Sequence, residues 1–357
     1  MEKIIYTENN PIVCEKKVAI AILGYNSVDY LKNFLPSFYT SDLKDAELIY
    51  IDNASNDVSI NFVHENFPDI KVFKIEVNRG FTNGYVKSLP FIKAEYYVLI
   101  NSDVEVSEGW LNPMLAEMEK DKNIAACQPK ILAYREKEKF EYSGACGGYI
   151  DYLGYPFCRG RIFETIEEDK GQYDEPAEIF WATGACMIVR ADVYHKLGGL
   201  DNDFYAHMEE IDLCWRINNA GYKIMVFPQA VVYHVGGSII KYKSFQKSYR
   251  NFRNNLIMIY KNLPKNKVWW MIPYRFFLDA VAAYKSLFSG NFSEFRAIVA
   301  AHKDFVAYFG KWTKKRKEVQ AMKTTEHKAT IYNKSIVWQY FAASKKRFSD
   351  LGWKVGK

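Results

Sequence analysis

The sequence has 357 residues, of which 49% are hydrophobic and 25% are charged, and a formal net charge of +6. This length and apolar content suffice for a substantial buried core. They exclude a largely disordered chain, which would combine low hydrophobicity with high net charge. We expect one main domain and an appendage.

Charge is distributed unevenly along the chain. Residues 1–240 contain 23 Lys and Arg against 36 Asp and Glu, a net charge of −13, whereas residues 241–357 contain 25 against 6, a net charge of +19. The two parts are therefore expected to meet different partners. The acidic part would repel a phosphate backbone, so we expect no nucleic acid among them.

The N-terminal segment and the cysteines indicate the cellular compartment. The segment MEKIIYTENNPIVCEKK carries charges where a secretory signal needs a continuous apolar core, so we expect a cytoplasmic protein. The six cysteines lack CxxC spacing and mostly lie in apolar stretches, which indicates buried thiols. They are Cys14, Cys127, Cys146, Cys158, Cys186 and Cys214.

Four short apolar runs in the N-terminal part have the composition of strands that are buried on both faces. They are residues 18–26, 47–51, 71–77 and 96–100, with helix-compatible segments between the first three and after the last. This alternation predicts an α/β fold with a mostly parallel sheet covered by helices. Ligands of such sheets bind beyond the carboxyl ends of the strands.

Polar residues follow each of these runs, which makes them candidates for ligand binding. No GxGxxG follows the first run and no GxxxxGK[ST] occurs, which argues against a dinucleotide-dependent oxidoreductase and a P-loop NTPase. The candidates are Tyr25, Asn26, Asp52, Asn53, Asn78, Arg79, Gly80, Asn101, Ser102 and Asp103.

The amino-acid composition changes in the middle of the chain. Residues 141–181 are rich in glycine and aromatic residues with few periodic apolar positions, and we expect an ordered excursion outside the core. The segment IFWATGACMIV predicts a strand, and MEEIDLCWRINNAGY predicts a helix that is closed by Gly221. The segment VFPQAVVYHVGG predicts a further strand that ends at His234.

Acidic side chains in these segments could carry chemistry. Asp103 lies in a turn after a strand, where a carboxylate can hold Mg²⁺ or Mn²⁺ together with phosphate oxygens, or can merely cap the turn. Glu209, Glu210 and Asp212 open the predicted helix, where the helix dipole favours acidic groups. Apolar neighbours would raise the pKa of such a carboxyl towards the range of a general base.

Two further positions allow two interpretations each. His234 precedes two glycines and could be a second metal ligand or an exposed residue at the end of a strand. Asp52 and Asn53 could recognise a nucleoside or could form local turns.

The C-terminal part, beyond residue 241, is basic and aromatic. Residues 268–288 are interrupted by charges and cannot span a bilayer as a clean apolar helix would. Arg275, Asp279 and Ser286 recur at helical spacing. They leave an apolar face of Trp270, Tyr274, Phe277, Leu278, Val281 and Phe288.

An aromatic face beside basic clusters such as KWTKKRKEV suits an anionic membrane surface. The alternative is an ordinary helical appendage that packs on the main domain with a solvated basic face. The sequence leaves both interpretations open.

Seven segments, taken in order, resemble the family-2 glycosyltransferases, which are inverting enzymes of the GT-A fold, in particular the rhamnosyltransferase-like enzymes of bacterial polysaccharide synthesis. The resemblance covers about residues 17–255 and implies a catalytic domain over residues 1–255, with a nucleotide-binding part at 17–132 and an acceptor part at 133–255. Residues 256–357 would form a helical C-terminal region. The segments are AILGYN, YIDNASND, NRGFTNG, YYVLINSDVEV, WATGACMIVR, GGLDNDFYAHMEEIDLCWRINNAGY and FPQAVVYHVGG.

The resemblance implies roles for single residues on the donor side. Asp52 matches the acidic residue that contacts the nucleoside, and Asn78, Arg79 and Asn83 match the lining of the donor pocket. Asp103 matches the last acid of the DxD-like metal motif. Asn101 replaces the first acid, so His234 becomes a candidate extra ligand.

The resemblance also implies roles on the acceptor side. The family's base lies in an acidic pair, here Glu209 and Glu210, with Glu210 in the base position. Trp181, Gly184 and Ala185 match the wall beneath donor sugar and acceptor, and we place Asp212 in the same pocket.

The implied reaction moves a sugar from a nucleotide diphosphate donor to a hydroxyl of a glycan or lipid-linked glycan in cell-surface glycan synthesis, with the enzyme at the inner face of the cell membrane. A divalent metal, Mg²⁺ or Mn²⁺, would bridge Asp103 and the diphosphate. Two alternatives remain. A sugar nucleotidyltransferase would need a basic glycine-rich loop after the first strand, which GYNSVDY lacks. A non-catalytic sugar-nucleotide-binding or scaffold protein is disfavoured by the acidic residues.

Overall fold

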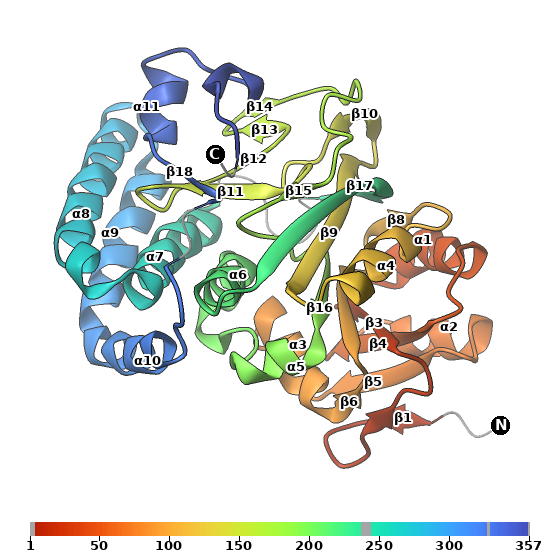
Figure 1. The fold of residues 1–357 in the computed structure, drawn as a ribbon. Coiled ribbons are helices and arrows are strands. Elements are labelled where there is room, and N and C mark those ends of the chain that lie inside the picture. Colours follow the sequence, from red (N-terminus) through yellow and green to blue (C-terminus); the bar gives the residue numbers. More distant parts are fainter. Residues whose placement is uncertain (1–3, 237–243, 327–328, 356–357) are drawn as a thin grey trace.

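The computed structural model describes residues 4–236, 244–326 and 329–355. One large twisted sheet runs through the molecule, with strand order β1-β5-β4-β3-β7-β16-β9-β17-β15 (Figure 1). Its strands are β1 (Ile5–Tyr6), β3 (Val18–Gly24), β4 (Ala46–Asn53), β5 (Lys71–Ile75), β7 (Tyr96–Asn101), β9 (Ile124–Ala133), β15 (Ala177–Glu178), β16 (Cys186–Arg190) and β17 (Lys223–His234).

The four predicted N-terminal strands are confirmed as β3, β4, β5 and β7, and they pair in parallel with one another in the order β5-β4-β3-β7. Beyond β7 the sheet becomes mixed, because β16 is antiparallel to both β7 and β9. Two short strands attach at this end, β8 (Val104–Val106) to β17 and β10 (Glu136–Phe140) to β9. A separate pair joins β2 (Ile12–Val13) to β6 (Ile92–Lys93).

Strand β3 is buried along its whole length because its side chains enter two different cores. Val18, Ile20 and Ile22 pack on one face of the sheet, and the alternate residues pack on the other face. This is why the run is apolar at every position instead of alternating. The covering helices are α1 (Val28–Thr40), α2 (Ser59–Asn66), α3 (Phe81–Ser88), α4 (Asn112–Lys120), α5 (Ala191–Lys196) and α6 (Glu209–Asn219).

A second sheet contains the glycine-rich segment, with strand order β14-β13-β12-β11-β18. The expectation that residues 141–181 lie outside the core is wrong. Tyr149 and Phe157 are buried, and the rings of Phe348 and Trp353 from the end of the chain pack against both. The strands are β11 (Gly148–Asp151), β12 (Pro156–Cys158), β13 (Arg161–Ile162), β14 (Thr165–Ile166) and β18 (Ile331–Tyr332).

The C-terminal part is mainly helical, and its helices stack beside α6 with α8 on the outside (Figure 1). The expected domain boundary at residues 255 and 256 falls inside α7, which runs without a break from Phe245 to Asn262. No described helix is both long and apolar enough to span a bilayer. The helices are α7 (Phe245–Asn262), α8 (Lys265–Phe288), α9 (Phe292–Ala307), α10 (Phe309–Ala321) and α11 (Ile336–Phe341).

Three short 3-10 helices complete the described elements. Five of the six cysteines are buried as free thiols, as predicted. Cys14 is half-buried. The 3-10 helices are η1 (Leu89–Phe91), η2 (Asn202–Phe204) and η3 (Ser349–Leu351).

A buried ionic network joins α6 to α7. The carboxylate of Asp212 is fully buried and accepts from Arg216 at 3.0 Å, from Lys261 at 2.9 Å and from Asn262 at 2.8 Å. Lys261 also donates to Asp201 at 2.6 Å. Because each charge has at least one opposite partner, the cost of removing these groups from water is offset.

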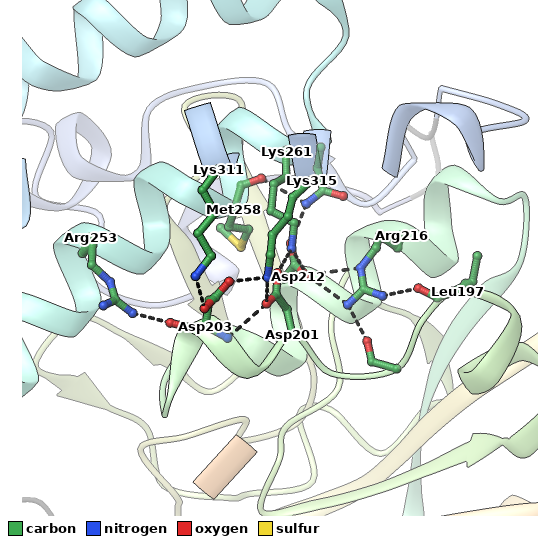
Figure 2. A network of polar contacts seen from close by, with 12 residues as sticks. Leu197, Asp201, Asp203, Asp212, Arg216, Arg253, Met258, Lys261, Lys311 and Lys315 are labelled. Atoms are coloured by element: carbon green, nitrogen blue, oxygen red, sulfur yellow. Dashed lines mark hydrogen bonds and ion pairs between the residues drawn. The ribbon is translucent and has the colours of Figure 1, made fainter. Parts of the chain in front are cut away.

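The network extends to α10, which holds the loop in front of α6. Lys311 and Lys315 donate to Asp203, and Lys315 also reaches Asp201. Arg253 of α7 donates to the carbonyl of Asp203. Figure 2 shows these side chains pointing toward one another from α6, α7, α10 and the loop. The basic C-terminal part thereby fixes the segment that leads into Glu209 and Glu210.

We predict that Asp212→Asn lowers the free energy of unfolding by about 3 kcal/mol, because it leaves Lys261 and Arg216 buried with reduced compensation. Urea denaturation measures this change. The matched control is Asp29→Asn, since Asp29 is exposed and lies 3.7 Å from Lys32. It should change stability by less than about 0.5 kcal/mol. Equal effects of the two substitutions would contradict the role of the network.

Candidate active site

Hydrogen bonds join the loops that follow β3, β4, β5 and β7. Ser55 Oγ accepts from the backbone N of Asn26 at 2.9 Å, and the Oδ1 of Asn26 accepts from the backbone N of Asn56 at 2.8 Å. Asn53 Nδ2 donates to the carbonyl of Gly80 at 3.2 Å. Ser102 N donates to the carbonyl of Leu23 at 3.3 Å. The polar residues after the four strands therefore lie together at one edge of the sheet.

Asp52 is fully buried, and its carboxylate accepts from Ser55 N at 3.0 Å and from the Tyr50 hydroxyl at 3.3 Å. These contacts are the local turn interactions that the sequence left as the alternative to nucleoside recognition. Neighbouring Asn53 differs, because its Oδ1 atom is buried without a hydrogen-bond partner.

The donor-side candidates after β5 differ in accessibility. Asn78 is half-buried, and its Oδ1 accepts from Gly80 N at 2.9 Å, whereas Arg79 is exposed. Asn83 is buried within α3. Tyr25, after β3, is 37% exposed and can meet a ligand from solvent.

Asp103 and His234 lie in contact, as the resemblance implied, and Glu141 joins them. The pairing of β8 with β17 places His234 opposite Val104, and the Nε2 atom of His234 lies 3.2 Å from the Oδ1 of Asp103. Its Nδ1 atom lies 3.5 Å from the Oε1 of Glu141. Burial alone would lower the pKa of His234, but the two carboxylates outweigh it and raise the pKa to about 10.

The approach of Glu141 depends on a glycine. Gly236 has a φ of +64°, and a Cβ atom at this position would lie 2.6 Å from the Oε1 of Glu141. A residue other than glycine would therefore push this carboxylate away.

The residues around Asp103 fit a divalent cation. The 3.2 Å contact between Asp103 and His234 is that of an ion pair, because the raised pKa keeps His234 protonated, and a cation would have to displace this proton before the imidazole could bind it. The Oδ1 of Asn101 is buried without a hydrogen-bond partner, and its Nδ2 lies 3.3 Å from His234 Nε2. No three His, Cys, Asp or Glu residues of the described ranges form a complete metal cage. A Mg²⁺ or Mn²⁺ that also binds phosphates needs only one or two protein carboxylates.

Glu209 and Glu210 begin α6, and each has a buried Oε2 atom without a hydrogen-bond partner. Burial and the neighbouring Glu210 raise the pKa of Glu209 well above its usual range. Burial also raises the pKa of Glu210, to about 7, although backbone donors act in the opposite direction. Glu210 is the more accessible of the two, since Glu209 is only 3% exposed.

The loop before α6 has an unusual backbone. Tyr205, His207 and Met208 all have positive φ angles, of 66°, 72° and 71°. Such conformations in residues other than glycine store strain and occur preferentially at functional sites. The carbonyl of Tyr205 accepts from the backbone N of Thr82 at 3.0 Å, so the loop is fixed to the start of α3.

The turn before β16 connects Asp103 to Glu210. The carbonyl of Ala185 accepts from Asn101 N at 3.1 Å, two residues before Asp103. A Cβ atom at Gly184 would lie 4.0 Å from the Cβ of Glu210 and 3.6 Å from the ring of Phe81. One short segment thus lies between the backbone that leads to Asp103 and the side chain of Glu210.

The sequence profile of Glycosyl transferase family 2 matches residues 19–198, about half of the chain. The chain belongs to this family. It is therefore a glycosyltransferase, as the resemblance of its motifs implied.

Curated relatives of this glycosyltransferase are distant in sequence. The N-acetylglucosaminyl-diphospho-decaprenol L-rhamnosyltransferase of Mycobacterium tuberculosis is 20% identical over 286 residues, which cover 75% of this chain and 91% of that protein. The low-salt glycan biosynthesis hexosyltransferase Agl10 of Haloferax volcanii is 22% identical over 250 residues, 67% of this chain and 74% of that protein.

A solved structure supports the predicted GT-A fold of the glycosyltransferase. The crystal structure of GalNAc-T7 with UDP, GalNAc and Mn²⁺ superposes with a TM-score of 0.53 at 16% identity. The match covers 71% of this chain and 48% of that one. At this identity the similarity concerns the fold alone.

Two expected residues of the acceptor pocket have structural contacts in this glycosyltransferase. The ring of Trp181 is buried against Gly148, and its Nε1 donates to the carbonyl of Tyr149 at 3.0 Å. Asp212 is fully buried in the ionic network, with both oxygens engaged. The expectation that Asp212 contacts an acceptor is therefore corrected, because its helix position turns it toward α7 rather than toward Gly184.

Sequence analysis missed three charged residues near the site. Glu141 lies in the segment that was expected outside the core. Lys247 and Arg250 come from α7, and both help to lower the pKa of His207 to about 4, although burial is the main cause. The guanidinium of Arg250 lies 4.0 Å from the ring centre of Tyr205. The acidic pair Glu209 and Glu210 gave no signal for these residues, because they come from segments that are distant in the sequence.

We predict that Gly184 keeps the space in front of Glu210 open. Gly184→Ala should fold with near wild-type stability, because the added Cβ has only ordinary contacts. Gly184→Leu should also fold but should lower sugar transfer at least about tenfold, because its side chain enters this space. Thermal unfolding and a transfer assay measure the two effects.

Gly148→Ala is the matched control, since a Cβ there would lie 2.1 Å from the Trp181 ring. It should destabilise the fold. Full transfer by the folded Gly184→Leu variant would contradict the assignment of this space.

Proposed function

We propose that this glycosyltransferase moves a hexose, with inversion, from a nucleotide diphosphate sugar to a hydroxyl of a glycan or lipid-linked glycan in cell-surface glycan synthesis. The observation that carries the proposal is the turn at Gly184 and Ala185, which contacts the Asp103 segment on one side and Glu210 on the other. With a donor and an acceptor bound at this turn, the donor diphosphate would lie near Asp103 and the acceptor hydroxyl would lie near Glu210.

Glu210 is proposed as the general base. Its pKa of about 7 leaves a useful fraction ionised at neutral pH and makes it basic enough to accept a hydroxyl proton. The pKa of Glu209 is raised further, so Glu209 keeps its proton when Glu210 loses one. Glu210 is also the more accessible of the two side chains, which favours it as the base of the pair.

Asp103 is proposed as the main ligand of a divalent cation, Mg²⁺ or Mn²⁺, with His234 and the Oδ1 of Asn101 beside it. A bound cation would neutralise charge on the diphosphate leaving group. The need for a cation follows from the charge of the catalytic part, since residues 1–240 carry a net charge of −13. Arg79, Lys247 and Arg250 are the nearby positive side chains that would complement the donor.

The donor and acceptor pockets are proposed around these groups. Asn78, Arg79 and Asn83 would line the donor pocket with Tyr25, Asn26 and Ser102, and Asn53 would offer its unpartnered Oδ1 to the nucleoside. Gly184 and Ala185 would support the sugar and the acceptor. Asp52 would act indirectly, by holding the turn that shapes the nucleoside end of the pocket.

A lipid-linked acceptor is supported by the names of the relatives. The mycobacterial relative acts on a diphospho-decaprenol acceptor, and the archaeal relative belongs to glycan biosynthesis. We propose that this enzyme works beside an anionic membrane surface, to which its C-terminal part, with a net charge of +19, would be attracted. The cytoplasmic location stays a prediction.

We predict that Glu210→Gln lowers transfer by at least about 10²-fold and leaves donor binding unchanged, because the amide cannot accept the proton. Glu209→Gln should retain most of the activity, since Glu209 is already protonated. Transfer from a panel of nucleotide sugars and calorimetric binding of the donor measure these effects. Full transfer by Glu210→Gln would refute the assignment.

The same assignment fixes the pH dependence. The base must be ionised, so kcat of the wild-type enzyme should rise with pH up to about 7 and level off above it. The Glu209→Gln variant lacks the neighbouring carboxyl, and its kcat should show the same single rise with pH. A rate that falls as pH increases through this range would contradict Glu210 as base.

We predict that donor hydrolysis depends on Mn²⁺ or Mg²⁺ and stops when the metal is chelated. Asp103→Asn should raise the Mn²⁺ concentration for half-maximal activity at least about tenfold, because a neutral amide binds the cation more weakly. Glu105→Gln is the control, since Glu105 is an acid two positions away that pairs with Lys137 at 2.5 Å. Equal metal requirements for all three proteins would contradict this site.

A further inference from the structure

Helix α8 has its polar side chains inside and its aromatic side chains outside. Arg275 and Asp279 are each 1% exposed, and the Nη2 atom of Arg275 lies 3.5 Å from the Oδ1 atom of Asp279. Arg275 donates to the carbonyl of Leu153 at 2.9 Å, and Asp279 pairs with His302 at 3.1 Å. Because the polar residues of α8 are used for packing, the opposite face of the helix is left to the apolar residues.

The outer face of α8 is an apolar stripe. From residue 269 to residue 284 the helix exposes no charged side chain. This part of the helix is about 22 Å long. The exposed residues are Trp269, Pro273, Tyr274, Phe277, Val281 and Tyr284. Of the face predicted from the sequence, Trp270 and Leu278 instead lie half-buried against the core.

The side chains of the stripe are highly exposed, and the stripe continues past Lys285 to the end of α8. Trp269 is 72% exposed, Phe277 is 62% exposed and Phe288, at the end of α8, is 85% exposed. Apolar surfaces of this extent on a folded protein mark interaction sites.

Helix α11 extends the same surface, and α8 and α11 lie next to each other at the outer edge of the molecule (Figure 1). Trp338 and Phe341 of α11 are 67% and 58% exposed. The Nζ atom of Lys285 lies 5.3 Å from the ring centre of Phe341, which joins the end of α8 to α11. We call this surface, formed by the exposed residues of α8 and α11, the α8–α11 face.

Positive charges surround the α8–α11 face. Lys265 lies at one end of α8 and Lys285 lies at the other, whereas Lys267 is paired with Glu326 at 2.6 Å. The Nζ of Lys346 lies 3.7 Å from the ring centre of Tyr340. The one acidic residue of α8, Asp279, is buried. Aromatic residues with lysines at their border are typical of helices that lie in the interface of an anionic bilayer.

We propose that the α8–α11 face docks on an anionic lipid bilayer, with the aromatic side chains in the headgroup region and the lysines on the lipid phosphates. This deepens the proposed function, on which it rests for the presence of a lipid-linked acceptor. Charge favours lipid over a second copy of the chain, because two copies facing each other would bring like-charged lysine borders together. A negatively charged lipid surface attracts the positively charged lysines around the α8–α11 face.

Flotation of the full-length protein with vesicles tests this docking. The protein should bind vesicles that contain phosphatidylglycerol and should bind pure phosphatidylcholine vesicles at least about tenfold more weakly. Raising the salt from about 0.05 M to about 0.5 M should weaken binding several-fold, because the screening length falls. The variant Trp269→Ser/Phe277→Ser/Phe288→Ser should lower the vesicle partition coefficient at least about tenfold.

The matched control carries Val13→Ser/Val58→Ser/Val77→Ser. These residues are 60%, 58% and 55% exposed and lie on the N-terminal part, so vesicle binding should stay at the wild-type level. Equal binding by the wild type and the α8 variant would overturn the proposal. So would a wild-type dimer that the α8 variant dissociates without any vesicle binding, since the face would then join two copies.

Failure of the docking can be told apart from failure of the proposed function. The α8 variant should transfer sugar to a soluble acceptor at the wild-type rate, because none of its substitutions lies at the candidate active site. Vesicle binding by a protein that transfers no sugar would leave the docking intact and refute the proposed reaction. Normal transfer without vesicle binding would refute the docking alone.

Discussion

The antiparallel pairing of β16 with β7 is the constraint on which the candidate active site depends. The pairing sets Ala185 beside Asn101 and places Gly184 next to Glu210, so that the backbone leading to Asp103 and the side chain of Glu210 lie at the same turn. A shift of one residue would turn the side chains of β16 to opposite faces of the sheet. The strand is buried along its length, and this burial stabilises the register.

Charge explains why the site needs support from the C-terminal part. The carboxylates of Glu209 and Glu210 are costly to bury at the start of α6, and the loop before them is strained. Lys261 and the lysines of α10 compensate by holding the acidic residues around this loop. The basic helices therefore help to hold the candidate active site, and the α8–α11 face is left for another partner.

The sequence was sufficient to predict the parallel strands of the sheet, because buried parallel strands have a strong apolar pattern, whereas His234 became a partner of Asp103 only through the resemblance to the family. It could not predict the place of Glu141, since irregular glycine-rich segments carry no periodic signal. Asp212 was misplaced because residues in one helical turn point in different directions. In α8 the period was visible, but a period does not tell which face is buried, and Arg275 is inside.

The central claim is that Asp103 and Glu210 face a single donor pocket across the turn at Gly184. A crystal structure of the enzyme with a nucleotide diphosphate and Mn²⁺ tests it most directly. The account predicts anomalous scattering from Mn²⁺ within coordination distance of the Asp103 carboxylate, and the terminal phosphate over Gly184 on the side of Glu210. Mn²⁺ and phosphate bound elsewhere, or Glu210 facing a separate cavity, would contradict it.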